Sequence, residues 1–189
     1  MIGRLLHWVY CLDLPEALIV IVISTVLFCL IHTKYSHLVL WRMCVGAMLL
    51  ALAGVILYTT LGNRSSTDRL AHCFVPFESY YEAMETGNME IYRSNLMNII
   101  LFYPVGLLAI SVLPQKWPGW CRCLLVVTVL SAVSGGIEFL QYRHSLGRFE
   151  VDDIIHNTTG ALLGCLAALT LFFFLDRIRK HHWAKWIRT

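Results

Sequence analysis

Long apolar stretches alternate with shorter polar ones along the chain, and this pattern predicts the fold. A helix needs roughly 20 residues to cross a bilayer core about 30 Å thick. Five stretches come close to that length: Pro15–Ile31, Leu38–Leu61, Leu96–Leu113, Cys121–Leu140 and Ile154–Leu175. We therefore predict an all-α fold, an integral membrane bundle of about five transmembrane helices.

The polar stretches divide the chain into three regions. We predict an N-terminal interfacial segment over residues 1–14, a transmembrane domain over residues 15–175 and a basic tail over residues 176–189. The longest hydrophilic stretch, Gly62–Arg93, is too short for an independent domain. Its aromatic residues favour a position on the membrane surface.

The composition agrees with a protein that has lipid as its main solvent. The apolar share is 58% and the charged share is 14%, whereas an average soluble domain has about 25% charged residues. The net charge of +3 is small and gives no reason to expect a nucleic-acid partner. The seven cysteines include no C-x-x-C pair, and the acidic residues do not match a calcium-binding loop. We expect no metal and no cofactor.

Basic residues in the flanking segments predict the orientation in the membrane. With five spans, the N-terminus and the second and fourth loops share one side, which holds Arg4, Arg64, Arg69, Arg93, Arg143 and Arg148. The other side holds Lys34, Arg42, Lys116, Arg122, Arg177, Arg179, Lys180, Lys185 and Arg188. The second side is richer in basic residues and is predicted to be cytoplasmic. The protein is therefore expected in the cell membrane, with its N-terminus outside and its C-terminus inside.

The third apolar stretch begins with polar side chains that lipid cannot satisfy. Asn95, Asn98 and Phe102 are spaced so that they share one face of a helix. Carboxamides that enter a membrane helix are costly unless they find partners. Pro104 removes a backbone donor and is expected to kink the helix, and Gly106 permits a neighbouring helix to approach closely.

A second polar segment runs from Glu138 to Gly164. Glu138 and Gln141 lie one turn apart at the end of the fourth helix. Four further polar residues follow in the loop and at the start of the fifth helix: Arg148, Asp152, Asp153 and Asn157. Gly160 and Gly164 then form a small-xxx-small packing face.

Three interpretations of these polar residues remain open: an internal network, a site that contacts a ligand, and a catalytic site. They could form an internal network, with Glu138 paired to Arg148 or Arg143, because membrane bundles use polar groups to join helices. They could instead form a site that contacts a ligand, since an ionisable residue within a span suggests function. The candidate ligand-binding or polar-cluster residues are Asn95, Asn98, Glu138, Gln141, Arg148, Asp152, Asp153 and Asn157. The candidate helix-packing residues are Pro104, Gly106, Gly160 and Gly164.

The order of these motifs resembles the VanZ-like family. An N-x-x-N-x-x-x-F-x-P-x-G stretch is followed by E-x-x-Q, by G-R and by D-D-x-x-x-N-x-x-G-x-x-x-G. Val75-Pro76-Phe77 is similar to a short element that precedes the first motif in that family. The resemblance covers about Leu38 to Phe174. It implies a small polytopic membrane protein associated with lowered sensitivity to teicoplanin-type lipoglycopeptide antibiotics, and it supplies neither a mechanism nor catalytic residues.

Three functions follow from these observations. The favoured one is a non-enzymatic antibiotic-resistance factor of the cell envelope, in which an outer-face polar cleft binds a lipid-linked cell-wall precursor or the antibiotic. The second is an enzyme acting on a lipid head group, with Glu138 as general base and Arg148 holding a phosphate. The third is a structural partner of another membrane protein, with Gly160 and Gly164 as the contact face. Membrane lipid is an expected partner in each case.

Overall fold

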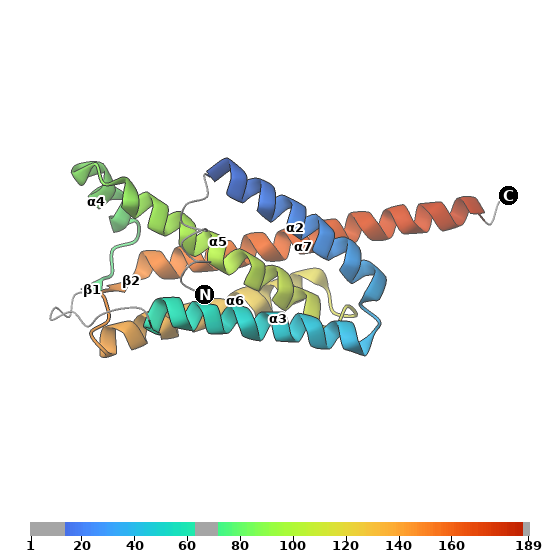
Figure 1. Cartoon of the computed structure of the whole chain (residues 1–189), viewed down its shortest axis with the longest axis horizontal. Coiled ribbons are helices and arrows are strands. Elements are labelled where there is room, and N and C mark those ends of the chain that lie inside the picture. Colours follow the sequence, from blue (N-terminus) through green and yellow to red (C-terminus); the bar gives the residue numbers. More distant parts are fainter. Residues whose placement is uncertain (1–13, 63–71, 187–189) are drawn as a thin grey trace.

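Five long helices dominate the computed structural model, which describes residues 14–62 and 72–186 (Figure 1). They are α2 (Leu14–Tyr35), α3 (Val39–Leu57), α5 (Met89–Val112), α6 (Gly119–Arg143) and α7 (Val151–Trp186). All five are long and apolar enough to cross a membrane. The predicted all-α bundle with five spans is confirmed. The predicted interfacial segment lies outside the described residues except for Leu14.

Short elements cover one end of the bundle. A π-helical turn, η1 (Tyr58–Gly62), continues α3, and a short helix, α4 (Glu78–Thr86), precedes α5. Two-residue strands β1 (His72–Cys73) and β2 (Phe149–Glu150) pair in parallel, with His72 opposite Phe149 and Cys73 opposite Glu150. The pairing ties the segment before α4 to the segment before α7 (Figure 1).

Two helices begin earlier than the apolar stretches predict. Helix α5 starts at Met89 because Asn88 caps it, with the Asn88 side chain accepting a hydrogen bond from the Glu90 amide at 3.0 Å. Helix α7 starts at Val151, so Asp152 belongs to its first turn and not to the preceding loop. Polar residues near the positive end of a helix dipole are favourable there. The length of the apolar stretch alone therefore underestimates the length of both helices.

The outer surface of the bundle is apolar, as expected for lipid contact. Val39, Leu40 and Leu50 on α3 are each more than 70% exposed, and Ile19 and Val22 on α2 are more than half exposed. Monomeric soluble proteins rarely expose contiguous apolar patches of this kind. The chain is a multi-pass membrane protein; its orientation stays a prediction.

Helices α5 and α7 form the centre of the fold and pack more extensively on each other than any other pair. Leu107, Leu108 and Ile110 of α5 are buried with Cys165 and Ala168 of α7 in one core cluster. A second cluster joins α3, α5 and α6 nearer to α4. The α5–α7 contact sets the positions of most of the polar residues described below.

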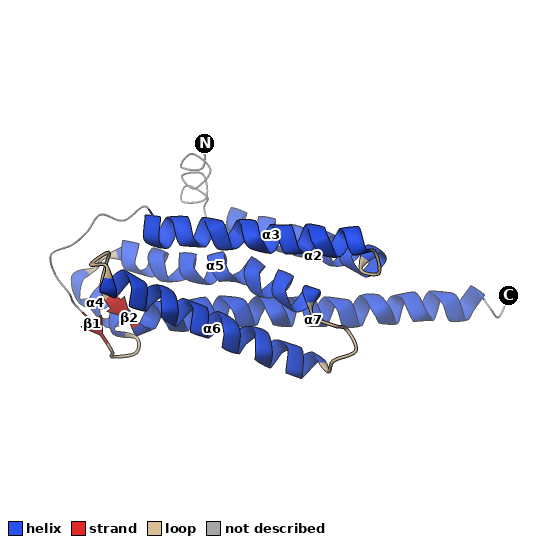
Figure 2. Ribbon diagram, turned by 90° about the horizontal axis from the view of Figure 1, so that it is seen from below, coloured by secondary structure: helices blue, strands red, loops and turns tan. Residues whose placement is uncertain are grey.

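Helix α7 continues through residue 176, where the sequence analysis placed the start of a separate tail. It remains helical to Trp186 and extends past the other helices toward the C-terminus (Figures 1 and 2). The bundle and the start of the basic tail thus share one helix.

Candidate functional site

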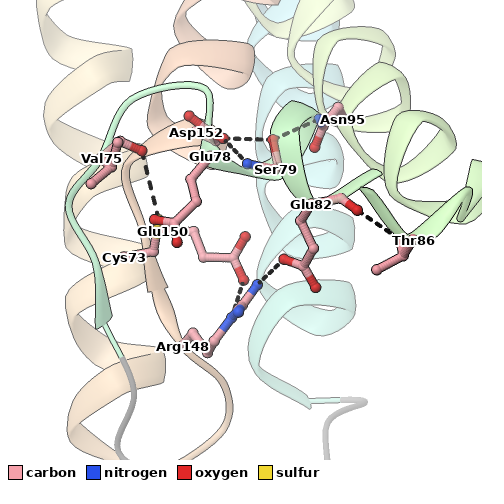
Figure 3. Close-up of polar contacts among 10 residues, drawn as sticks. All are labelled: Cys73, Val75, Glu78, Ser79, Glu82, Thr86, Asn95, Arg148, Glu150 and Asp152. Atoms are coloured by element: carbon pink, nitrogen blue, oxygen red, sulfur yellow. Dashed lines mark hydrogen bonds and ion pairs between the residues drawn. The ribbon is translucent and has the colours of Figure 1, made fainter. Parts of the chain in front are cut away.

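The most buried acid of the candidate set is Asp152, which holds helix α4 in place. Asp152 is 1% exposed, and its carboxylate accepts a hydrogen bond from the backbone amide of Phe77. It also accepts hydrogen bonds from the backbone amide and the hydroxyl of Ser79 (Figure 3). Phe77 precedes α4 in a left-handed conformation, with φ 66°, and supplies no side-chain cap. Asp152 therefore caps α4 from another helix, where a negative charge also complements the helix dipole.

Asn95 extends this contact to helix α5. Its side-chain amide donates to Ser79 Oγ at 2.9 Å, and Asn95 itself is buried. The Ser79 hydroxyl therefore accepts from Asn95 while it donates to Asp152. Helices α4, α5 and α7 therefore meet at one serine.

The remaining asparagines of the candidate set join α7 to two different helices. Asn98 of α5 donates to Asp153 Oδ1 at 2.7 Å, and Asn157 of α7 donates to Ser134 Oγ of α6 at 2.9 Å. Such hydrogen bonds between membrane helices typically contribute about 0.6 kcal/mol and reach 1–2 kcal/mol. The two asparagines of α5 contact different partners, Ser79 of α4 and Asp153 of α7.

Glu138 and Gln141 hold backbone segments at the same end. Glu138 is 3% exposed, and its Oε2 accepts a hydrogen bond from the Glu150 amide at 3.0 Å. Gln141 is 1% exposed and donates to the Thr60 carbonyl at 2.9 Å. That carbonyl belongs to the π-helical turn η1. Both side chains thus contact backbone of neighbouring elements.

Arg148 lies at the surface between two acids. Its Nε is 3.0 Å from Glu150 Oε1, and its terminal Nη2 is 3.3 Å from Glu82 Oε2 (Figure 3). The Arg148 side chain is 47% exposed, so these ion pairs contribute little stability. Arg148 therefore pairs with Glu150 of β2 and Glu82 of α4. In the enzymatic interpretation, Arg148 would hold a phosphate with the N–H donors that these two acids do not use.

Several residues of this end were not singled out by the sequence analysis. Ser79, Glu82 and Tyr80 come from the segment after Val75-Pro76-Phe77, and the Tyr80 hydroxyl lies 2.9 Å from His156 Nε2. His156 is 3% exposed. The only sequence signal was the position of the segment just after that short element.

The thiol of Cys73 contacts the same α4 segment. It donates to Glu78 Oε2 at 2.7 Å. Burial raises the pKa of the Cys73 thiol from 9.0 to about 11, and the hydrogen bond to Glu78 adds to the rise. Because the thiolate is the nucleophile, its fraction at neutral pH is about a hundredfold lower than for a thiol with a pKa of 9.

We predict that Cys73 reacts slowly with a maleimide at pH 7 and faster as the pH rises toward 11. Glu78→Gln removes the carboxylate and lowers the pKa, so the reaction at pH 7 should accelerate. The gain should stay below a hundredfold because burial, the larger cause, remains. Mass spectrometry of the labelled peptide measures the rate. Glu85→Gln, an exposed acid on the same helix, is the matched control. Equal rates for wild type and Glu78→Gln would contradict this account.

The glycines predicted to pack helices lie in the α5–α7 contact. A Cβ built on Gly106 would lie 2.1 Å from the Ala161 carbonyl oxygen, and one on Gly160 would lie 2.2 Å from that of Ile99. A Cβ on Gly164 would lie 2.0 Å from the Tyr103 carbonyl oxygen. The glycine face of α7 is therefore covered by α5 of the same chain and is not free to contact another protein.

An apolar groove of about 490 Å³ runs between α2, α3 and α5. Phe28, Met48, Leu52 and Leu107 contribute to its lining, and the polar contribution includes Thr25 and Tyr103, whose oxygens are 3.0 Å apart. Pro104 and Ile100 also line it. Because proline has no N–H, the Ile100 carbonyl loses its usual helical donor. The groove combines apolar walls with a few polar groups, as small-molecule sites do.

Within residues 14–62 and 72–186, no group of three or more His, Cys, Asp or Glu side chains could hold a metal ion. The candidate set contains acids that are each engaged by donors of neighbouring segments, as the contacts above describe.

Comparison with known proteins identifies the family. No curated protein and no solved structure matches the chain significantly. A family model described as VanZ/LLP1 matches residues 43–174, more than half of the chain, and this range includes all the candidate site and packing residues. Helix α2 lies before it. The chain belongs to the VanZ/LLP1 family.

Proposed function

We propose that this protein lowers sensitivity to teicoplanin-type lipoglycopeptides as a non-enzymatic membrane factor. In this proposal, it binds the long apolar chain of the antibiotic or of a lipid-linked cell-wall precursor. The observation that carries the proposal is the apolar groove between α2, α3 and α5. Its volume lies within the range of typical ligand sites, roughly 300–1,000 Å³.

The chemistry of the groove fits an acyl chain. Its walls are aliphatic and aromatic side chains of three membrane helices, so a chain can enter from the surrounding lipid. The Thr25 and Tyr103 hydroxyls share one hydrogen bond, in which one donates and the other accepts. Burying a chain there replaces contacts with lipid tails, so shape decides the preference more than hydrophobicity does.

The polar residues at the α4 end support the groove in this proposal. Asn95, Asn98 and Asp153 fix α5 against α7 and α4, and α5 supplies one wall of the groove. Such a supporting shell keeps a binding surface in one geometry. In this proposal the ligand contacts the apolar groove between α2, α3 and α5, and not the polar cleft that the sequence analysis proposed.

The test measures the teicoplanin susceptibility of cells in which a larger side chain fills part of the groove. Cells that express the wild-type protein should tolerate more teicoplanin than cells without the gene, and their vancomycin sensitivity should stay unchanged because vancomycin carries no acyl chain. Ala51 lines the groove, so Ala51→Phe should fill part of it and return teicoplanin sensitivity to the level without the gene. Membrane levels of each variant are measured in parallel.

The matched control is Ala53→Phe, the same change on an exposed position of α3 that does not line the groove. It should keep the wild-type phenotype. A photoreactive lipoglycopeptide and a photoreactive polyprenyl-linked precursor then distinguish the two ligands by which one labels the groove. Full teicoplanin tolerance in a well-expressed Ala51→Phe variant would refute the groove as the site.

A further inference from the structure

A basic pocket of about 480 Å³ lies at the end of the bundle opposite α4. It is formed where α2 turns into α3, where α5 connects to α6, and by the later part of α7 (Figure 1). Its polar lining includes Lys34, His37, Gln115, Arg122, Asp176 and Arg179. The sequence analysis used these basic residues only to predict orientation.

Arg122 is the buried cation of this pocket. It stands in the first turn of α6 and is 9% exposed, and its Nε has no hydrogen-bond partner among the described residues. A guanidinium carries five N–H donors and no acceptor. A buried cation whose Nε–H lacks an acceptor is costly, so this position favours a ligand that supplies negatively charged oxygens.

The other charges of the pocket leave an excess of positive charge. Asp176 is the acid in the lining, and it pairs with Arg179 at 2.9 Å. Lys34 lies with its Nζ 5.1 Å from the Tyr35 ring centroid. The Asp176–Arg179 pair is neutral overall, so Lys34 and Arg122 together give the pocket a net positive charge.

An apolar groove continues from the basic pocket. It shares Thr33, Lys34, Asp176 and Arg179 with the pocket and adds Leu175 and Ile178 of α7. Ile178 is 63% exposed. A ligand with an anionic head and an apolar tail can therefore occupy both surfaces at once.

We propose that this pocket binds the phosphate group of an anionic phospholipid, with Arg122 and Lys34 contacting phosphate oxygens and the acyl chain lying along Leu175 and Ile178. Arginine suits phosphate because its planar group can donate two parallel hydrogen bonds. Basic pockets between membrane helices are known to bind lipid head groups on the cytoplasmic side, and this end is the predicted cytoplasmic one. The site is independent of the apolar groove between α2, α3 and α5.

The experiment measures thermal unfolding of the full-length protein in a neutral detergent with added lipid. Phosphatidylglycerol should raise the unfolding midpoint, and phosphatidylcholine should not. Arg122→Gln should abolish the difference, and Lys34→Gln should weaken the apparent affinity for phosphatidylglycerol about fivefold, the equivalent of one basic residue near an anionic membrane surface. Native mass spectrometry counts the bound lipid.

The control is Arg177→Gln, which removes an exposed positive charge from the same end of α7 outside the pocket. It should keep the full response to phosphatidylglycerol. If Arg122→Gln does not fold, Lys34→Gln tests the proposal alone, because Lys34 lies at the bundle surface and its replacement should not prevent folding. Equal responses to the two lipids, or an unchanged response in Lys34→Gln, would overturn the proposal. An equal response to inorganic phosphate would keep the phosphate site but overturn the lipid as its source.

Discussion

Replacing Gly164 with alanine should destabilise the bundle strongly. The new methyl group would lie 2.0 Å from the Tyr103 carbonyl oxygen and 2.8 Å from the Leu107 nitrogen. Both are backbone atoms of α5, so they cannot move aside as a flexible side chain does, and the two central helices must separate. Overpacking of this kind typically costs about 1–3 kcal/mol, and the upper part of that range is expected here. The measurement is the free energy of unfolding in mixed micelles of detergent and sodium dodecyl sulfate.

The control for Gly164 is another helical glycine with open space beside it. Among the described residues, no heavy atom beyond its chain neighbours and the nearby backbone of α6 lies within 4 Å of a Cβ built on Gly136. Gly136→Ala should leave stability unchanged or increase it slightly, because alanine restricts the unfolded chain. If Gly164→Ala is as stable as Gly136→Ala, the close α5–α7 contact is not as described.

Removing the carboxylate of Asp152 should release helix α4 from the bundle. Asp152→Ala deprives the Phe77 amide, the Ser79 amide and the Ser79 hydroxyl of their acceptor. Leaving buried donors unsatisfied costs about 1–3 kcal/mol each, so local stability should fall by roughly 2–4 kcal/mol after partial hydration. Hydrogen exchange of the α4 amides should accelerate, while exchange in α6 should change little.

Asp176→Asn provides the comparison for Asp152, because Asp176 is an exposed acid on the same helix at the opposite end. It should leave exchange in α4 unchanged. Ser79→Ala should give an intermediate effect, since it removes the hydroxyl and keeps both backbone donors. Wild-type protection of α4 in Asp152→Ala would show that α4 is held by other contacts.

The spans could be predicted because apolar length is a local property of the sequence. Only one side of the α5–α7 contact, the glycine face of α7, could be predicted from the sequence. The spacing of Gly160 and Gly164 indicates a smooth face, but periodicity does not say which helix covers it. The structure assigns it to Ile99 and Tyr103 of α5, so the glycine face could not serve as the surface for a partner protein.

The role of individual polar residues could not be predicted because their partners are distant in sequence. Asp152 and Ser79 are 73 residues apart, and Arg148 and Glu82 are 66 apart. The α4 segment has no long apolar run, so the sequence predicts only that it lies on the membrane surface. The sequence analysis used Arg122 only as a basic flanking residue, because its burial depends on how the α2–α3 and α5–α6 connections meet α7.

Helix α7 connects the two ends of the bundle through one continuous helix. Its 36 residues correspond to roughly 54 Å, well beyond a hydrocarbon core of about 30 Å. Asp152 sits in its first turn and Arg179 lies seven residues before its end. One continuous helix therefore carries both the acid that caps α4 and the Asp176–Arg179 pair of the basic pocket. A ligand that bound one tilt of α7 more tightly than another would change the α4 contact, and by linkage a change at α4 would alter the affinity for that ligand by the same factor.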